Sequence, residues 1–149
     1  MFVKTKDGQL DRYPYTVGDL RRDNPRTSFP KNVPTDMLAD YGVYPVVRAA
    51  VPQFDSLVQS LVAHAAPTED AGQWVLGYDV VQKSEDMAGD NIRRERNRLL
   101  SETDWIVIMH AERGTNIPAV WELYRQALRD ITSQGGFPYT IEWPTKPGE

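Results

Sequence analysis

The fold is decided by residues 74–86, WVLGYDVVQKSED, because the spacing of the apolar residues changes within this stretch. In its first part apolar residues alternate as in a strand, with Trp74, Leu76 and Tyr78 on one side. From Ser84 onward the spacing becomes helical. Ser84 can cap a helix, and two acidic residues follow in the first turn, where the helix dipole favours negative charge. The sequence therefore predicts that strands give way to helices near residue 84.

The chain before this point is predicted to form two β-hairpins. The first covers residues 1–16 and turns at the Asp7-Gly8 pair, a strong two-residue turn signal. The second pairs the Trp74 strand with residues 57–63, through a turn near residues 69–72. One face of this second hairpin is so apolar that we expect another part of the protein, or a partner, to cover it.

The segment between the two hairpins is interrupted by prolines. Proline recurs from Pro14 to Pro52, and it breaks both helix hydrogen bonding and sheet ladders. We expect irregular, packed chain there. The exceptions are a short helix at residues 34–40, capped by Thr35 or Asp36, and an extended stretch at residues 43–47.

Two helices are expected after residue 84. The first carries a narrow apolar stripe, and the second a wide one that includes Trp121, Tyr124 and Leu128. A link at residues 105–116 should join them into an antiparallel hairpin, and Gly135-Gly136 should stop the second helix. The aromatic, proline-rich tail that follows should be extended and packed on the helices.

These elements together predict an α+β fold. We expect two domains: a β-rich N-terminal domain at residues 1–83, and a helical hairpin with an extended C-terminal tail at residues 84–149.

Composition excludes several classes of function. The chain has a net charge of -4 and a sequence pI of about 5.2, so it has no overall attraction to nucleic acid or to an anionic membrane. It has no cysteine, which excludes disulfides, zinc-thiolate sites and thiol catalysis. No apolar run approaches the roughly 20 residues that span a bilayer, and the first residues do not resemble a signal peptide. We expect a soluble, unexported protein without a membrane partner.

The residues that usually carry catalysis form no recognisable pattern. The two histidines, His64 and His110, stand in no acid–histidine–nucleophile order, and nothing near either suggests a zinc site. Glycine-rich phosphate-binding motifs are absent from the sequence, and paired acids such as Glu85-Asp86 do not face each other on a helix. The sequence predicts no catalytic residue, no cofactor and no metal.

The arginine run at residues 93–98 raises the question of nucleic-acid binding. Residues 84–104 contain four arginines but six acidic residues, so the segment lacks the excess positive charge of a nucleic-acid face. We favour a helix end with ion pairs such as Asp90–Arg94. The alternatives are a charged docking face for a protein partner and, after it, a nucleic-acid-binding regulator.

Four segments of the C-terminal third resemble a known family. They are residues 98–105 (RLLSETDW), 124–131 (YRQALRDI), 136–138 (GFP) and 143–147 (WPTKP). Their order and spacing are similar to the phage tail assembly chaperone, or tail fibre assembly protein, family over about residues 98–147. Segments nearer the N-terminus resemble those that precede this module in related tail proteins.

The resemblance implies a non-enzymatic role in bacteriophage assembly. It implies a chaperone that binds a tail fibre or other tail protein in the host cytoplasm and then leaves. The alternative is a structural adaptor that stays in the virion tail or fibre. A hydrolase is a remote further alternative. The sequence leaves open which protein is the client and which oligomeric state the protein adopts.

The predicted contact surface is the apolar link at residues 106–109 together with the free side of the second hairpin. The alternative for the link is an extra strand. The candidate partner-binding residues are Trp105, Ile106, Ile108 and Met109, together with Trp143 in the tail.

Overall fold

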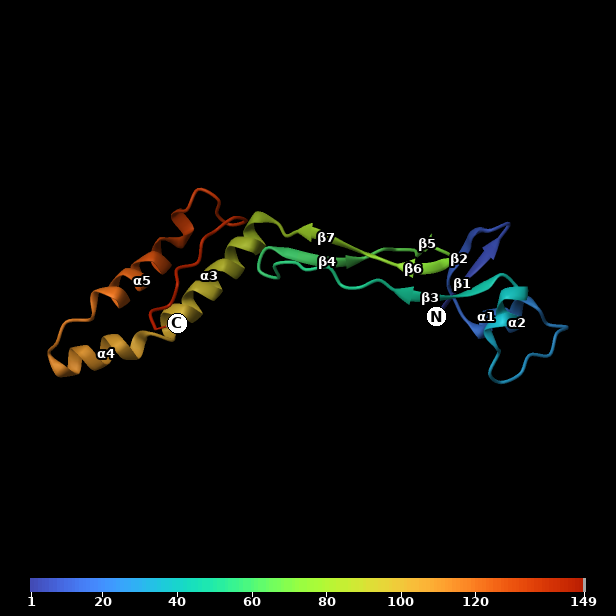
Figure 1. Ribbon diagram of the computed structural model, residues 1–149, viewed down its shortest axis with the longest axis horizontal. Coiled ribbons are helices and arrows are strands. Elements are labelled where there is room, and N and C mark those ends of the chain that lie inside the picture. The colour runs from blue at the N-terminus through green and yellow to red at the C-terminus, as the bar shows by residue number, and fades with distance from the viewer. Residues whose placement is uncertain (149) are drawn as a thin grey trace. The chain divides into compact units, whose positions relative to one another are not determined.

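A computed structural model describes residues 1–148 and divides the chain into two compact units (Figure 1). The first unit comprises residues 1–53 and 61–80. The second comprises residues 54–60 and the chain from residue 81 onward. Strands dominate the first unit and helices the second, which confirms the predicted α+β class. The predicted domain boundary after residue 83 stays a prediction.

The first unit is built on a five-stranded sheet in the order β2-β1-β3-β6-β5. Its strands are β1 (Phe2–Lys6), β2 (Gln9–Tyr15), β3 (Val43–Arg48), β5 (Thr68–Asp70) and β6 (Gln73–Leu76). Neighbouring strands are antiparallel except for β3 and β6, which run parallel with Val46 opposite Trp74. The N-terminal hairpin is confirmed. Asp7 and Gly8 both have positive φ, at 53° and 77°, as the tightest hairpin turns require.

The predicted pairing of the second hairpin is confirmed for the part of the strand after Gly77 and was wrong for the part before it. The expected single strand is divided at Gly77 into β6 and β7 (Tyr78–Gln82). β6 pairs with β5 across the Ala71-Gly72 turn, whereas β7 pairs with β4 (Gln59–Ala63) in a separate two-stranded sheet. The His64 ring packs so closely on Gly77 that a Cβ there would lie 2.9 Å from it. Apolar alternation alone does not reveal this break.

The proline-rich segment contains a helix that the sequence analysis missed. α1 (Val17–Asp23) replaces the irregular chain expected there, because Thr16 and Asp19 form a reciprocal cap. The Asp19 backbone N–H donates to Thr16 Oγ1 at 3.2 Å, and the Thr16 N–H donates to the Asp19 carboxylate at 2.9 Å. The predicted short helix is confirmed as α2 (Thr35–Asp40), although Pro34 occupies the capping position. The extended stretch is β3.

The core of the first unit lies between the sheet and these two helices. Tyr15, Leu20, Leu38 and Val43 are buried together. The Tyr15 hydroxyl donates a 2.6 Å hydrogen bond to Asp23 at the end of α1, and Arg12 pairs with the same carboxylate. Hydrogen bonds from Tyr15 and Arg12 lower the pKa of Asp23, while burial and the nearby carboxylate raise the pKa of Tyr15. These bonds tie the first hairpin to α1.

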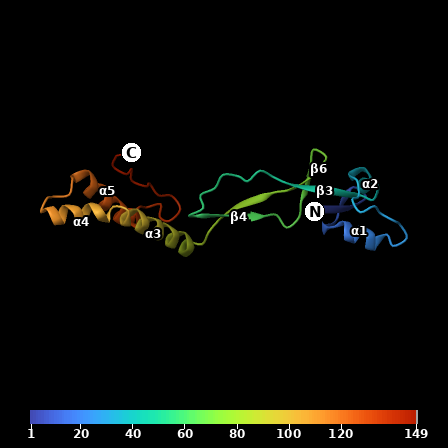
Figure 2. The ribbon, with the colours of Figure 1, turned by 90° about the horizontal axis from the view of Figure 1, so that it is seen from below.

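The second unit contains three helices and the C-terminal tail. The helices are α3 (Glu85–Ser101), α4 (Asp104–Arg113) and α5 (Ala119–Arg129), and a short 3-10 turn covers Asp130–Ser133. Figures 1 and 2 both show α4 continuing onward from the end of α3, while α5 returns beside them. This arrangement confirms the predicted antiparallel helical hairpin. Ser84 caps α3 by accepting from the Met87 N–H.

The predicted link between the helices is itself a helix. Residues 105–116 were expected to connect two helices, with a strand as one alternative, but α4 occupies most of them. Residues 104–113 contain neither glycine nor proline, and Asp104 places a carboxylate in the first turn. Gly114, with φ of 62°, ends the helix. The apolar residues in this stretch therefore belong to a short helix that has apolar side chains on both its buried and its exposed sides.

The tail completes the core of the second unit. Val58, Ala88, Ile92 and Ile131 are buried together, and Phe137, Ile141 and Trp143 of the tail pack against them. The tail is fixed further by a reciprocal pair of hydrogen bonds between the Gln134 side chain and the backbone of Glu142, at 2.9 and 2.8 Å. The extended, packed tail expected from the sequence is therefore present.

The side chain of Arg125 joins all three helices. It is only 9% exposed. Its guanidinium donates to the Leu100 carbonyl at 2.9 Å, to the Thr103 hydroxyl, and to the Asp104 carboxylate at 2.8 Å. Leu100 is in the last turn of α3 and Asp104 in the first turn of α4. The guanidinium thus satisfies groups on both sides of the α3–α4 break.

Replacing Arg125 with methionine should destabilise the second unit. The change keeps the aliphatic bulk but leaves Thr103 and the Leu100 carbonyl without their charged donor, a loss of about 2–3 kcal/mol. Urea unfolding followed by circular dichroism at 222 nm measures the effect. Arg129→Met is the matched control, since Arg129 is exposed and pairs with no acidic residue within residues 1–148. Equal destabilisation by both changes would contradict the assigned role of Arg125.

Replacing Tyr15 with phenylalanine should weaken the first unit by about 1 kcal/mol at pH 7, because Asp23 loses a hydrogen-bond donor. The folded pKa of Tyr15 lies above its unfolded value, so its stabilisation is present at neutral pH and is lost as the pH rises beyond about 10. Urea midpoints measured from pH 7 to 11 should show the wild-type advantage shrinking. Tyr44→Phe, an exposed position, is the control. A wild-type advantage that is independent of pH would contradict the stabilising role assigned to the Tyr15 hydroxyl.

Candidate protein-binding surface

Large apolar side chains are exposed on α4 and α5. Trp105 is 60% and Ile108 57% exposed on α4, while Val120 is 58% and Leu123 70% exposed on α5. Each pair is spaced three residues apart and so shares one side of its helix. Exposed apolar side chains grouped in this way are typical of protein-binding surfaces. The second unit therefore offers apolar side chains of the kind that a protein partner could cover.

The five candidate contact residues take different positions in the structure. Trp105 and Ile108 point outward, and Met109 beside them is partly buried. Ile106 is 2% exposed, so its side chain contributes to the core and presents no surface to a partner. Trp143 is partly buried against the core of the second unit. The surface available for contact at these positions thus consists of Trp105 and Ile108, with Met109 at its edge.

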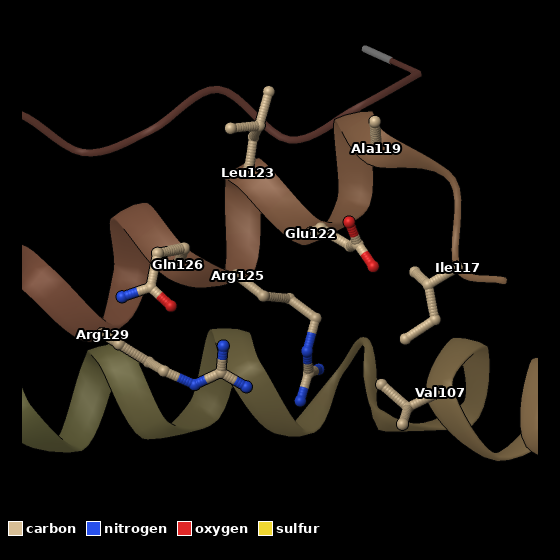
Figure 3. A pocket seen from close by; sticks show the side chains of 8 residues that line it. All are labelled: Val107, Ile117, Ala119, Glu122, Leu123, Arg125, Gln126 and Arg129. Carbon is tan, nitrogen blue, oxygen red and sulfur yellow. The ribbon is translucent and has the colours of Figure 1, made fainter.

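A groove of about 570 Å³ runs along the other side of α5 (Figure 3). Val107 of α4 and Ile117 lie together at one end. Arg125 and Arg129 reach across from α5 toward α3, and Leu123 stands on the rim. The side chain of Leu123 projects away from the groove floor. α5 therefore presents both an apolar ridge and a groove with charged and apolar parts.

A second, more open groove of about 490 Å³ separates α5 from the tail. Val120, Leu123 and Ala127 line one side, and tail residues 144–148 line the other. Lys146 of the tail lies 3.5 Å from Glu102 at the end of α3, which fixes the tail beside the helices. Leu123 lines both grooves, so it is the most accessible apolar side chain on α5.

Two of the four arginines in the run at residues 93–98 of α3 pair with acids of the same helix or its end. Arg98 bonds to Glu95 and Glu102. Asp90 pairs with Arg93 at 3.1 Å, whereas the sequence analysis expected it to pair with Arg94. Hydrogen bonds from Arg98 lower the pKa of Glu95 and raise the pKa of Arg98. Glu95 interrupts the apolar stripe because it has this partner. Arg93 and Arg98 are therefore part of an ion-paired helix surface, whereas Arg94 and Arg96 form no ion pair within residues 1–148.

The histidines lie in separate settings. His64 contacts Asp79 at 3.1 Å in the first unit, and His110 contacts the Thr115 hydroxyl at 2.8 Å in the second. Within residues 1–148, no three histidine, cysteine or acidic side chains are grouped closely enough to hold a metal ion. None of the helices in this range has the length and apolar character needed to cross a membrane.

The four segments that suggested a family meet in the second unit. Arg125 from the second segment binds Thr103 and Asp104 from the first, and Lys146 from the last pairs with Glu102. Phe137 from the third packs under α3, 3.4 Å from where a Cβ on Gly89 would lie. Much of the signature thus holds the unit together.

Two important residues were not recognised from the sequence. Leu123 lies outside the predicted apolar face of α5, and Arg125 carries a charge within it. An arginine between Trp121 and Leu128 on a buried face is a signal that could have identified the buried donor, because such a charge needs partners. Leu123 offers no comparable signal, since isolated exposed leucines are common.

The comparisons agree with this structural picture. Residues 89–148 match the model of the family described as phage tail assembly chaperone protein. No curated protein and no solved structure matches the chain. The matched range contains α4 and α5 whole, most of α3 and the described tail, which are the elements that Arg125 and Lys146 hold together. Residues 89–148 are therefore similar to the phage tail assembly chaperone family, as the resemblance of residues 98–147 led us to expect.

Proposed function

We propose that this protein is a non-enzymatic bacteriophage assembly chaperone that binds a tail or tail-fibre protein while that client folds or assembles. The observation that carries the proposal is the match of residues 89–148 to the family described as phage tail assembly chaperone protein. The exposed apolar side chains on α4 and α5 support it, because a chaperone must offer apolar surface to a client whose own apolar surface is not yet buried. Such a role would be performed in the host cytoplasm.

The proposed client contact centres on Trp105 and Ile108. Both side chains are more than half exposed, although each is large and apolar. Tryptophan is among the residues that contribute most to protein–protein binding when a partner covers it. Met109 extends this surface and adds a flexible side chain that can adapt to different client shapes. Ile106 holds α4 in place from the buried side.

The test is co-expression with the product of the neighbouring tail or fibre gene. The wild-type chain should form a complex with the client and raise its soluble yield. The double change Trp105→Ser and Ile108→Ser should weaken the complex about thirtyfold and lower that yield, because two contact side chains of about 1 kcal/mol each are removed. Met87→Ser is the matched control, since Met87 is 57% exposed on α3, away from α4.

The possible outcomes test the proposed chaperone function and the proposed contact surface separately. A client that is equally soluble alone, and that forms no complex, would overturn the chaperone proposal. A complex that tolerates the double change would place the contact elsewhere. Recovery of the protein from purified virions at a fixed ratio to the tail would favour an adaptor that remains in the particle over a chaperone that leaves.

A further inference from the structure

We propose that the groove along α5 binds a segment of the client in which an apolar side chain and a carboxylate lie a few residues apart. This inference rests on the proposed function and specifies its chemistry at a second surface, separate from Trp105 and Ile108. The groove volume of about 570 Å³ is sufficient for the side chains of one peptide segment. The groove has two chemically different ends, and each end selects one part of the occupant.

One end of the groove is apolar. Val107 and Ile117 lie together there, and Ala119 continues the apolar lining toward α5 (Figure 3). An aliphatic or aromatic side chain placed on these residues would be removed from water without leaving a polar group unpaired. Leu123 on the rim would cover the occupant from the side of α5, since it is 70% exposed in the structure described here.

The opposite end of the groove is cationic. Arg129 lines it, and within residues 1–148 no acidic side chain forms an ion pair with Arg129. The neighbouring Arg125 differs, because its charge is already matched by Asp104 at 2.8 Å. Arg129 is therefore the available cation, and a guanidinium of this kind binds a carboxylate through two parallel hydrogen bonds.

A third charge sets the orientation of the occupant. Glu122 lies on the Ile117 side of Arg125, whereas Arg129 lies on the far side (Figure 3). Glu122 and Arg129 are seven residues apart on α5, or about 10 Å along the helix at 1.5 Å per residue. Glu122 would repel an acidic group at the apolar end, and Arg129 would attract it at the other. The two charges therefore place the occupant's apolar side chain near Ile117 and its carboxylate near Arg129.

The experiment is a selection of short random peptides on the full-length protein. Peptides that bind the wild type should be enriched in a large apolar residue close to an aspartate or glutamate. Arg129→Glu should replace that acidic preference with a basic one. For a selected peptide, changing its glutamate to glutamine should weaken binding to the wild type about fivefold, as expected for an exposed ion pair of about 1 kcal/mol, and should not weaken binding to Arg129→Glu.

Arg113→Glu is the matched control. Arg113 is an exposed arginine at the end of α4 that does not line the groove, so its reversal should leave the selected sequences unchanged. Leu123→Ser should weaken the binding of all selected peptides. Circular dichroism should show that all three variants are folded. Selection of the same peptides by the wild type and Arg129→Glu would overturn the proposal, as would the absence of any enrichment.

Two further considerations distinguish this proposal from dimerisation through the groove and from the proposed chaperone function. A wild-type dimer that Arg129→Glu converts to a monomer in sedimentation would assign the groove to a second copy of this chain, and would overturn it. Peptide selection does not use the client, so it can succeed even where the co-expression test fails. A failure of the groove proposal can therefore be distinguished from a failure of the proposed chaperone function.

Discussion

A single buried guanidinium determines how the helices of the C-terminal unit are joined. Arg125 reaches from α5 to the carbonyl that ends α3 and to the carboxylate that begins α4. The break between α3 and α4 at Thr103 leaves backbone groups that need partners, and Thr103 itself is 1% exposed. Because the donor on α5 satisfies this break, α5 is fixed at the junction. The outward side of α4, with Trp105 and Ile108, and the groove along α5 both follow from that geometry.

This arrangement explains what the recognisable sequence signature encodes. Arg125 donates to Thr103 and to Asp104, and Lys146 pairs with Glu102. These residues connect the helices and the tail to one another, so this part of the signature is structural. The exposed side chains that can touch a partner, such as Leu123, lie largely outside these bonds. A scaffold of this kind can keep its fold while its contact residues are adapted to different clients.

Several parts of the fold could be predicted from the sequence because each has a local cause. The Asp7-Gly8 turn, the Ser84 cap and the apolar face around Leu128 depend on neighbouring residues alone. The pairing of β6 could not be predicted in this way, because β6 lies parallel to β3, with Val46 opposite Trp74, and strands so far apart in the sequence give no local signal. The α4 helix was missed because a short apolar run fits a strand, a link or a helix equally well.

The candidate site was predictable only in part for a related reason. Periodicity shows which residues share a helix face, but the position of that face relative to the core depends on tertiary packing. Trp105 and Ile106 are adjacent in the sequence, yet one is exposed and the other buried. The groove depends on three helices and on the charges of Glu122 and Arg129, which look like ordinary surface residues in the sequence.

The central claim is that the C-terminal unit binds a tail or fibre protein through the outer surfaces of α4 and α5. Hydrogen–deuterium exchange on the full-length protein, alone and in complex with the neighbouring gene product, tests this claim most directly. We predict slower exchange in residues 104–113 and 119–129 on complex formation, with little change in residues 1–53. Slower exchange confined to residues 1–53 or 61–80, with the helices unaffected, would contradict the account.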